Sequence, residues 1–247
     1  MLQGYEYVRV GQQSALVRGE SAETVLHALL ENTDTSPDNR AGRGTTLRFP
    51  LADGGAGIIR EYRRGGLLYH VNANAYLSNR PLRELRVADY LWNKGFRIPE
   101  PLGICWWRRA GLFYGRYAAR ALAAVHVQEY LETNTDVSPE TCTQVGEIIR
   151  EMHKLGVFHA DLQVRNILLA QETPYLIDFD NARRFASLSS RKRARNLFRL
   201  RRSFEKNGID LRWYEMILAG YGDVPRHPVL SFVYSAKSRL SGQGSRK

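Results

Sequence analysis

The sequence has very little cysteine and no long apolar run. Its 247 residues include two cysteines, Cys105 and Cys142, which are too few for a disulfide framework and lack the spacing of a zinc site. We expect both to be buried, reduced thiols in a reducing compartment. No stretch approaches the roughly 18 apolar residues that span a bilayer, and the first residues lack the pattern of a secretory signal. We therefore expect neither a small secreted protein nor an integral membrane protein.

Acidic residues are outnumbered in this chain. Lys and Arg total 36 against 25 Asp and Glu, which gives a net charge of +11. Residues 183–206 alone hold ten basic residues and one acid, a net +9. The hydrophobic fraction of 43% is that of a globular protein. Such a chain needs an acidic partner, which could be nucleic acid, anionic lipid or a phosphorylated substrate.

The chain changes character near residue 115. Before it, short β-like segments separated by glycine-rich turns predict strands and hairpins, with one helix at Pro81–Asn93. Beyond it, Ser138 followed by Pro139 is a typical helix start. We therefore expect an α+β protein with a β-rich lobe of residues 1–115 and a mainly helical lobe of residues 116–247.

The most informative stretch is His159–Leu169, followed by an apolar strand that leads to Asp178. Phosphoryl transfer needs a carboxylate that orients the acceptor hydroxyl, together with oxygen ligands for magnesium. Asp161 fits the first role. Asn166, five residues later, fits an amide ligand of the metal, and Asp178 fits the main carboxylate ligand. His159 would brace the loop from inside.

This pattern, H-x-D-x-x-x-x-N and then D-F-x, resembles the catalytic signature of the protein-kinase-like fold. The resemblance implies two lobes with ATP and Mg²⁺ bound between them. It also implies that Gly42 and Gly44 lie in a phosphate-binding turn, and that Arg60 contacts phosphate and pairs with Glu84. Without the signature, the glycines would be a plain turn and Arg60 and Glu84 surface charges. Kinases carry Lys at the Arg60 position, and Arg is bulkier and holds phosphate bidentately.

Two further departures concern the substrate. Gln163 stands where eukaryotic protein kinases have Lys, and Asp180 replaces their glycine after Asp-Phe. No Ala-Pro-Glu follows downstream. A protein substrate is therefore not expected, and the pattern favours a small molecule or a glycolipid.

Longer motifs indicate which group of kinase-like enzymes the chain resembles. The segments 60–67, 82–84, 159–162, 177–180 and 196–203 together resemble the bacterial lipopolysaccharide core kinases, and among them those that act on 3-deoxy-D-manno-octulosonic acid (Kdo). This resemblance implies transfer of the γ-phosphate of ATP to the 4-hydroxyl of a Kdo residue on lipid A precursor. It also implies a peripheral position at the cytoplasmic face of the bacterial inner membrane.

Other interpretations remain open at this point. A heptose kinase of the same pathway is the nearest, and a nucleotide-binding pseudokinase that acts as a membrane scaffold is another. Residues 183–206 predict a helix that docks through its apolar residues and presents arginines to an anionic membrane, although a solvated charged face is the simpler alternative. Nucleic acid is not expected, because no recognition motif is present. The sequence does not define the oligomeric state.

Overall fold

A computed structural model describes residues 2–31, 37–38, 46–62, 77–134 and 138–224. It divides into two compact units, one of Met1–Ala123 with Phe179–Asn181, the other of Ala124–Asp178 with Ala182–Lys247. The division falls later than the predicted residue 115, because the last strand of the first sheet continues through Arg120. Gly42 and Gly44 lie outside the described residues, as do residues 63–67 of the segment 60–67.

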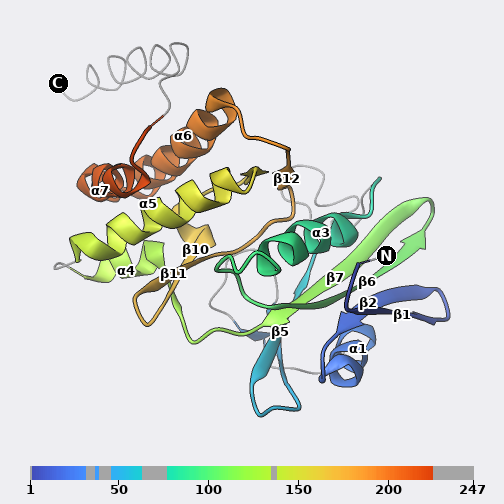
Figure 1. Cartoon of the computed structure of the whole chain (residues 1–247). Coiled ribbons are helices and arrows are strands. Elements are labelled where there is room, and N and C mark those ends of the chain that lie inside the picture. The colour runs from blue at the N-terminus through green and yellow to red at the C-terminus, as the bar shows by residue number, and fades with distance from the viewer. Residues whose placement is uncertain (1, 32–36, 39–45, 63–76, 135–137, 225–247) are drawn as a thin grey trace, which may run out of the picture. The chain divides into compact units, whose positions relative to one another are not determined.

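An antiparallel sheet is the framework of the first unit (Figure 1). Its strands lie in the order β1-β2-β6-β7-β5-β4-β3. The hairpins predicted around 53–57 and 108–111 are confirmed, since they join β4 to β5 and β6 to β7. The elements of this unit are β1 (Tyr5–Val10), β2 (Gln13–Arg18), α1 (Ala22–Leu30), β3 (Pro37–Asp38), β4 (Thr46–Pro50), β5 (Ala56–Glu61), α3 (Arg80–Trp92), β6 (Pro101–Arg109) and β7 (Leu112–Arg120).

Helices α1 and α3 cover opposite faces of this sheet. Ala15 of β2 shares a buried cluster with Leu29 of α1. Leu16, the next residue, belongs to a second cluster with Leu85 of α3. Because successive side chains of a strand point to opposite faces, the two clusters mark the two sides of the sheet. Helix α3 confirms the predicted helix at 81–93 and carries Glu84.

Helix α1 shows that the prediction of a single helix in this lobe is wrong. Val25 and Leu29, four residues apart, are fully buried. The helix has 9 residues, which is too short to be stable without packing. Its N-cap, Ser21, accepts a hydrogen bond from the Ala52 backbone N–H at 3.2 Å instead of capping the helix. The helix buries Val25 and Leu29 in the cluster that it shares with the sheet, and it lies within a lobe where short β-like segments dominate the sequence pattern.

The second unit is mainly helical, with short strands between the helices (Figure 1). The helix predicted after Ser138 is confirmed, and the Ser138 hydroxyl accepts a hydrogen bond from the Glu140 backbone N–H at 3.3 Å. The elements are β8 (Val125–His126), α4 (Val127–Thr133), α5 (Pro139–Lys154), β9 (Val157–Phe158), the 3₁₀ turn η1 (Val164–Asn166), β10 (Ile167–Ala170), β11 (Thr173–Leu176), β12 (Arg183–Arg184), α6 (Ser190–Asn207) and α7 (Leu211–Tyr221).

Both cysteines are buried, and they form no disulfide with each other. Burial raises the pKa of the Cys105 thiol to about 12 and that of the Cys142 thiol to about 11. Because the thiolate is the reactive form, these residues are inert packing groups, in agreement with the sequence-based expectation.

Helices α5 and α7 approach each other closely through two glycines. A Cβ atom on Gly146 of α5 would lie 2.0 Å from the Ile217 carbonyl oxygen and 2.5 Å from the Tyr221 backbone nitrogen. A Cβ atom on Gly220 of α7 would lie 2.0 Å from the Thr143 carbonyl oxygen. Since the neighbouring atoms are backbone, a side chain at either position would push the helices apart.

We predict that Gly146→Ala lowers the free energy of unfolding by about 1–3 kcal/mol, the usual cost of overpacking a core. Helix propensity alone predicts the opposite sign, a gain of up to about 1 kcal/mol. Urea titration measures the difference, and Glu147→Ala, an exposed neighbour on the same helix, is the matched control. A Gly146→Ala protein more stable than wild type would contradict the close contact.

Candidate active site

The loop after β9 is held by His159, whose side chain is fully buried. Its Nδ1 accepts a hydrogen bond from the Asp161 backbone N–H at 3.2 Å. The proton is therefore on Nε2, which donates to the Ile177 carbonyl oxygen at 3.0 Å. Burial lowers the pKa of this imidazole, so it stays neutral. His159 thus fixes the backbone of Asp161 and the strand end before Asp178, which is the bracing role that the sequence predicts.

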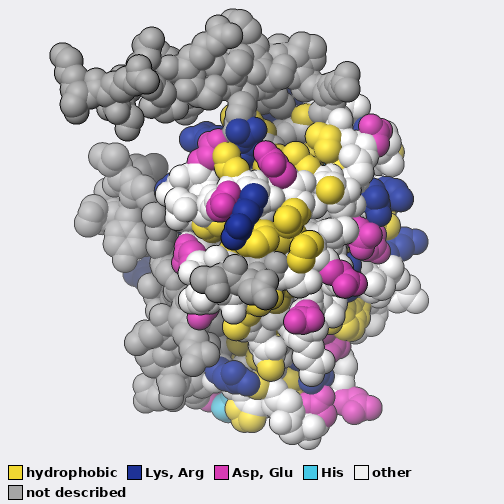
Figure 2. All heavy atoms as spheres, turned by 90° about the vertical axis from the view of Figure 1, so that its left-hand side faces the viewer, with side chains coloured by type: hydrophobic (Ala, Val, Ile, Leu, Met, Phe, Trp, Pro, Cys, Tyr) yellow, Lys and Arg dark blue, Asp and Glu magenta, His cyan; other side chains and the backbone are white. Residues whose placement is uncertain are grey.

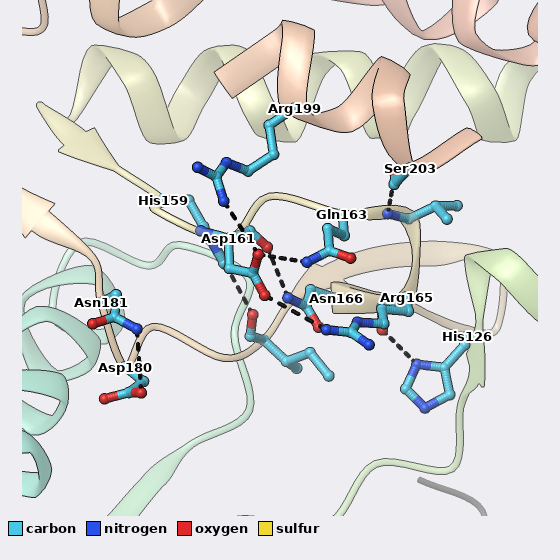
Figure 3. Close-up of polar contacts among 12 residues, drawn as sticks. His126, His159, Asp161, Gln163, Arg165, Asn166, Asp180, Asn181, Arg199 and Ser203 are labelled. Carbon is cyan, nitrogen blue, oxygen red and sulfur yellow. Dashed lines mark hydrogen bonds and ion pairs between the residues drawn. The ribbon is translucent and has the colours of Figure 1, made fainter. Parts of the chain in front are cut away.

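Three side chains surround the Asp161 carboxylate (Figure 3). The Gln163 amide donates to Oδ1. Arg199 of α6 places Nη1 3.5 Å from the same oxygen, and Arg165 places Nη2 3.7 Å from Oδ2. The Asp161 side chain keeps 34% of its surface exposed, so a substrate can reach it.

The predicted metal ligands, Asn166 and Asp178, lie on adjoining backbone. The Ile177 N–H donates to the Asn166 carbonyl oxygen at 3.0 Å, directly before Asp178. The Asn166 Nδ2 donates to the Asp161 carbonyl oxygen at 2.8 Å, which orients its amide. Asp178 has φ of +67°, a left-handed conformation that is uncommon outside glycine and that often occurs at functional sites.

Asn166 and Asp178 suit a Mg²⁺ ion that takes most of its ligands from phosphates and water. Two residues are too few for a metal site built from protein ligands alone. Magnesium prefers oxygen ligands, and it commonly takes one or two from the protein and the rest from phosphates and water. Asn166 and Asp178 offer an amide oxygen and a carboxylate. Among the described residues, no group of three or more His, Cys, Asp or Glu side chains could hold a metal ion.

Helix α6 holds the loop from the other side. The buried Asn196 side chain pairs with both backbone groups of His159: its Oδ1 accepts from the N–H at 3.2 Å and its Nδ2 donates to the carbonyl oxygen at 2.5 Å. One turn further on, Arg199 reaches Asp161. Two turns from Asn196, the Ser203 hydroxyl accepts from the Val164 N–H at 3.0 Å. Residues 196, 199 and 203 therefore form one face that contacts the loop.

Asn196 is itself held by a buried chain of hydrogen bonds. Its Oδ1 lies 3.1 Å from Nε2 of His153 on α5. The other ring nitrogen, Nδ1, lies 3.0 Å from the Tyr221 hydroxyl on α7. Burial lowers the pKa of His153 to about 4. A neutral imidazole therefore connects helices α5, α6 and α7 to the loop.

In the first unit, Arg60 of β5 and Glu84 of α3 form the predicted ion pair. The Arg60 Nη2 lies 2.6 Å from each Glu84 oxygen. The Tyr62 hydroxyl also donates to Glu84, and burial raises the pKa of this phenol well above its usual value. The Glu84 side chain is 3% exposed and Arg60 31%. The pairing is confirmed, whereas the phosphate contact of Arg60 remains a prediction.

Asp180, the residue that replaces the kinase glycine, has a partner within the first unit. Arg80, at the start of α3, places Nη1 3.2 Å from the Asp180 carboxylate. Its Nη2 donates to the Asn181 amide oxygen at 2.7 Å. Asp180, which stands in place of the kinase glycine, therefore connects the segment after Asp178 to α3, the helix that carries Glu84.

Sequence reasoning missed several residues of this arrangement. Tyr62 is an apolar strand end in the sequence, and nothing there marks it as a partner of Glu84. In the sequence, Asn196 and Ser203 stand out only as members of the segment 196–203, which contributes to the family resemblance. Arg199 stands out only as one of ten basic residues. Their spacing of three and seven places them on one helical face, which is the signal that could have found them.

The sheet, the helical second unit and the Asp161 loop are the features of the protein-kinase-like phosphotransferases. Within that class, the chain belongs to the lipopolysaccharide kinase (Kdo/WaaP) family, which matches residues 33–221. It is 32% identical over 194 residues to a 3-deoxy-D-manno-octulosonic acid kinase of Vibrio vulnificus (strain CMCP6), covering 73% of this chain and 80% of the relative. A kinase of the same name from Xylella fastidiosa (strain 9a5c) is 34% identical over 202 residues, covering 76% and 75%.

A solved structure supports the same fold. WaaP, determined in complex with acyl carrier protein, superposes with a TM-score of 0.56 at 18% sequence identity. The match covers 91% of this chain and 89% of WaaP. The prediction of a two-lobed kinase-like fold is confirmed by this likeness.

The buried histidine predicts how stability depends on pH. An unfolded histidine titrates near pH 6.5, whereas His153 titrates at about 4 in the folded protein. Between these values the unfolded chain binds more protons, so the free energy of unfolding falls as the pH falls. From about pH 7 to about pH 5, the contribution of His153 should fall by about 2 kcal/mol. Urea titration across this window measures it.

His153→Gln is the test of this assignment, because glutamine can donate to Asn196 but does not titrate. The variant should lose stability less steeply than wild type on acidification, by about 2 kcal/mol over the same window. An unchanged pH dependence would mean that the pKa of His153 is the same in the folded and the unfolded protein, which would contradict the effect of burial.

Proposed function

We propose that this protein is an ATP-dependent kinase that phosphorylates the 4-hydroxyl of a Kdo residue on lipid A precursor, in lipopolysaccharide inner-core biosynthesis. The observation that carries the proposal is the family match over residues 33–221, which includes every proposed catalytic and metal-binding residue. The 3-deoxy-D-manno-octulosonic acid kinases of Vibrio and Xylella are relatives over most of the chain.

In this proposal Asp161 acts on the acceptor. Its carboxylate accepts a hydrogen bond from the 4-hydroxyl and so aims the oxygen at the γ-phosphorus. The new P–O bond forms as the bond to the ADP oxygen breaks, and the hydroxyl proton passes to Asp161. The Gln163 amide, which donates to Asp161 Oδ1, holds the carboxylate in place for this task.

Asp178 and Asn166 would hold Mg²⁺ against the phosphates. When bound, the metal would offset the charge that develops on the transferring phosphoryl group. The hydrogen bond from Asn166 to the Asp161 carbonyl oxygen couples the position of one ligand to the position of the base.

Arg60 would contact the phosphates of ATP in place of the usual Lys. Glu84 holds its guanidinium through Nη2, and the Tyr62 hydroxyl donates to the same carboxylate. A planar guanidinium suits bidentate phosphate binding. Gly42 and Gly44 remain candidates for backbone contacts to phosphate.

We also propose a peripheral position at the anionic inner membrane. Within the described part of the chain, no helix is long and apolar enough to cross a bilayer. Helix α6 buries Leu197, Leu200 and Phe204, while basic residues of the 183–206 segment stay exposed: Arg183, Arg184, Arg191, Arg195, Arg202 and Lys206. Acidic and basic side chains are interspersed on the face drawn in Figure 2, so a membrane-binding surface should be a local patch.

The function is tested by phosphate transfer to two acceptors, a Kdo-bearing lipid A precursor and a heptosylated core. Wild type should phosphorylate the Kdo residue, with the phosphate located at the 4-hydroxyl by mass spectrometry and NMR.

Asp161→Asn should lower turnover by roughly 10²–10⁴-fold, the usual effect of losing a general base. Asp178→Ala should abolish transfer and weaken Mg·ATP binding. Asp223→Asn, an exposed aspartate of the second unit, is the control.

Each rival function gives a different result in the same assay. Transfer to the heptose alone would identify a heptose kinase. Nucleotide binding without transfer to either acceptor would indicate a scaffold. Near wild-type turnover in Asp161→Asn would remove this residue from the chemistry.

Membrane binding is tested by neutralising three exposed arginines of the segment, Arg183, Arg184 and Arg191, to Gln. Each basic residue near an anionic surface contributes about 1 kcal/mol, so binding to vesicles that contain anionic lipid should fall about a hundredfold. Sedimentation measures it, and wild-type binding should also weaken steeply with salt. The matched control changes three exposed arginines of the first unit, Arg48, Arg86 and Arg109, to Gln. Equal losses in both triple variants would contradict a local binding patch.

A further inference from the structure

Two arginines from different elements meet at one carboxylate. Arg199 comes from α6 and Arg165 from η1, and they approach separate oxygens of Asp161 (Figure 3). Helix α6 places Arg199 there because Asn196, one turn earlier, is fixed on the His159 backbone. Among the described basic residues of the 183–206 segment, Arg199 is therefore the one that reaches the candidate base.

Both contacts are too long for these arginines to be fully engaged by Asp161. Charge-assisted N–H···O bonds are usually about 2.7–2.9 Å long, whereas these distances are 3.5 and 3.7 Å. Each guanidinium has five N–H donors and contacts Asp161 through one nitrogen. The Arg199 side chain is 39% exposed and the Arg165 side chain 48%. Donors of both residues are thus within reach of a molecule bound at Asp161.

The charges around Asp161 do not balance. One carboxylate faces two guanidinium groups, and the third neighbour, Gln163, is neutral. One positive charge is left over beside the proposed base. An acceptor that carries a negative charge would complement it, whereas a neutral sugar offers no such complement.

The proposed acceptor carries such a charge close to its reacting hydroxyl. Kdo is a 2-ulosonic acid, so its carboxylate is attached to C2 of the ring, and C3 alone separates C2 from C4. When the 4-hydroxyl meets Asp161, the carboxylate is therefore held near the groups that flank Asp161. A heptose has no carboxylate at all.

We propose that Arg199, together with Arg165, binds the carboxylate of the acceptor sugar and so makes the enzyme select an acidic sugar over a neutral one. This inference rests on the proposed Kdo kinase function. Arg199 would then determine which sugar is accepted, although its place in the basic 183–206 segment suggests membrane binding.

The experiment compares two acceptors that differ at one group, a Kdo-bearing lipid A precursor and the same molecule with its Kdo carboxylate converted to the uncharged carboxamide. Wild type should prefer the acid in kcat/KM by roughly tenfold to a hundredfold, the range expected for hydrogen bonds to a charged group. Arg199→Gln should lower kcat/KM for the acid by this factor and leave the ratio of the two acceptors near one. Arg199→Lys, which keeps the charge, should retain part of the preference.

The ratio separates binding of the carboxylate from other roles of Arg199. If Arg199 only positions Asp161 or contacts the phosphoryl group, both acceptors should suffer equally in Arg199→Gln, and that result would overturn the inference. Arg212→Gln, an exposed arginine of α7 outside the 183–206 segment, should keep the wild-type ratio, and the KM for ATP should be unchanged in every variant.

The wild-type comparison needs no substitution and therefore does not depend on how the variants fold. Equal kcat/KM for acid and carboxamide would overturn the inference while leaving the Kdo kinase function in place. No transfer to either acceptor would instead reject the proposed function, and the inference with it.

Discussion

The pairing of the Asn196 amide with the backbone of His159 is the contact on which the candidate site depends. His159 is fully buried, so its N–H and carbonyl groups cannot turn to water and need partners inside the protein. Asn196 supplies both partners from α6. The imidazole of His159 can then fix Asp161 on one side and Ile177, next to Asp178, on the other. Without this pairing, two buried backbone groups of His159 would lose their hydrogen-bond partners, in the residue that connects Asp161 with the strand end before Asp178.

This contact also changes the interpretation of α6. A helix with so many basic residues is expected to serve only as a charged, solvent-exposed surface. Three of its positions nevertheless contact the loop that carries Asp161. Its apolar side docks the helix, and its polar positions 196, 199 and 203 contact the loop. The same helix also carries the arginines for which we propose binding of the acceptor and of an anionic surface.

Much of the fold and the core of the site could be predicted from the sequence, because the signals are local. The Asp161 to Asn166 spacing and the strand before Asp178 lie within twenty residues of each other. The pairing of Arg60 with Glu84, in contrast, follows only from the resemblance to kinases that this local signature establishes. The partners of these residues could not be predicted, because they depend on tertiary contacts. Asn196 lies 37 residues from His159, and inside a basic run it looks like part of a solvated face. Helix α1 is also absent from the sequence prediction, because a helix of 9 residues needs its packing against the sheet to be stable.

Amide hydrogen exchange tests most directly whether α6 holds the catalytic loop. The measurement compares residues 157–166 in wild type, in Asn196→Ala and in the control Arg202→Ala. The account predicts much faster exchange of these amides in Asn196→Ala, with the strands of the first unit unchanged and the control equal to wild type. Protection of residues 157–166 that is the same in Asn196→Ala as in wild type would contradict it.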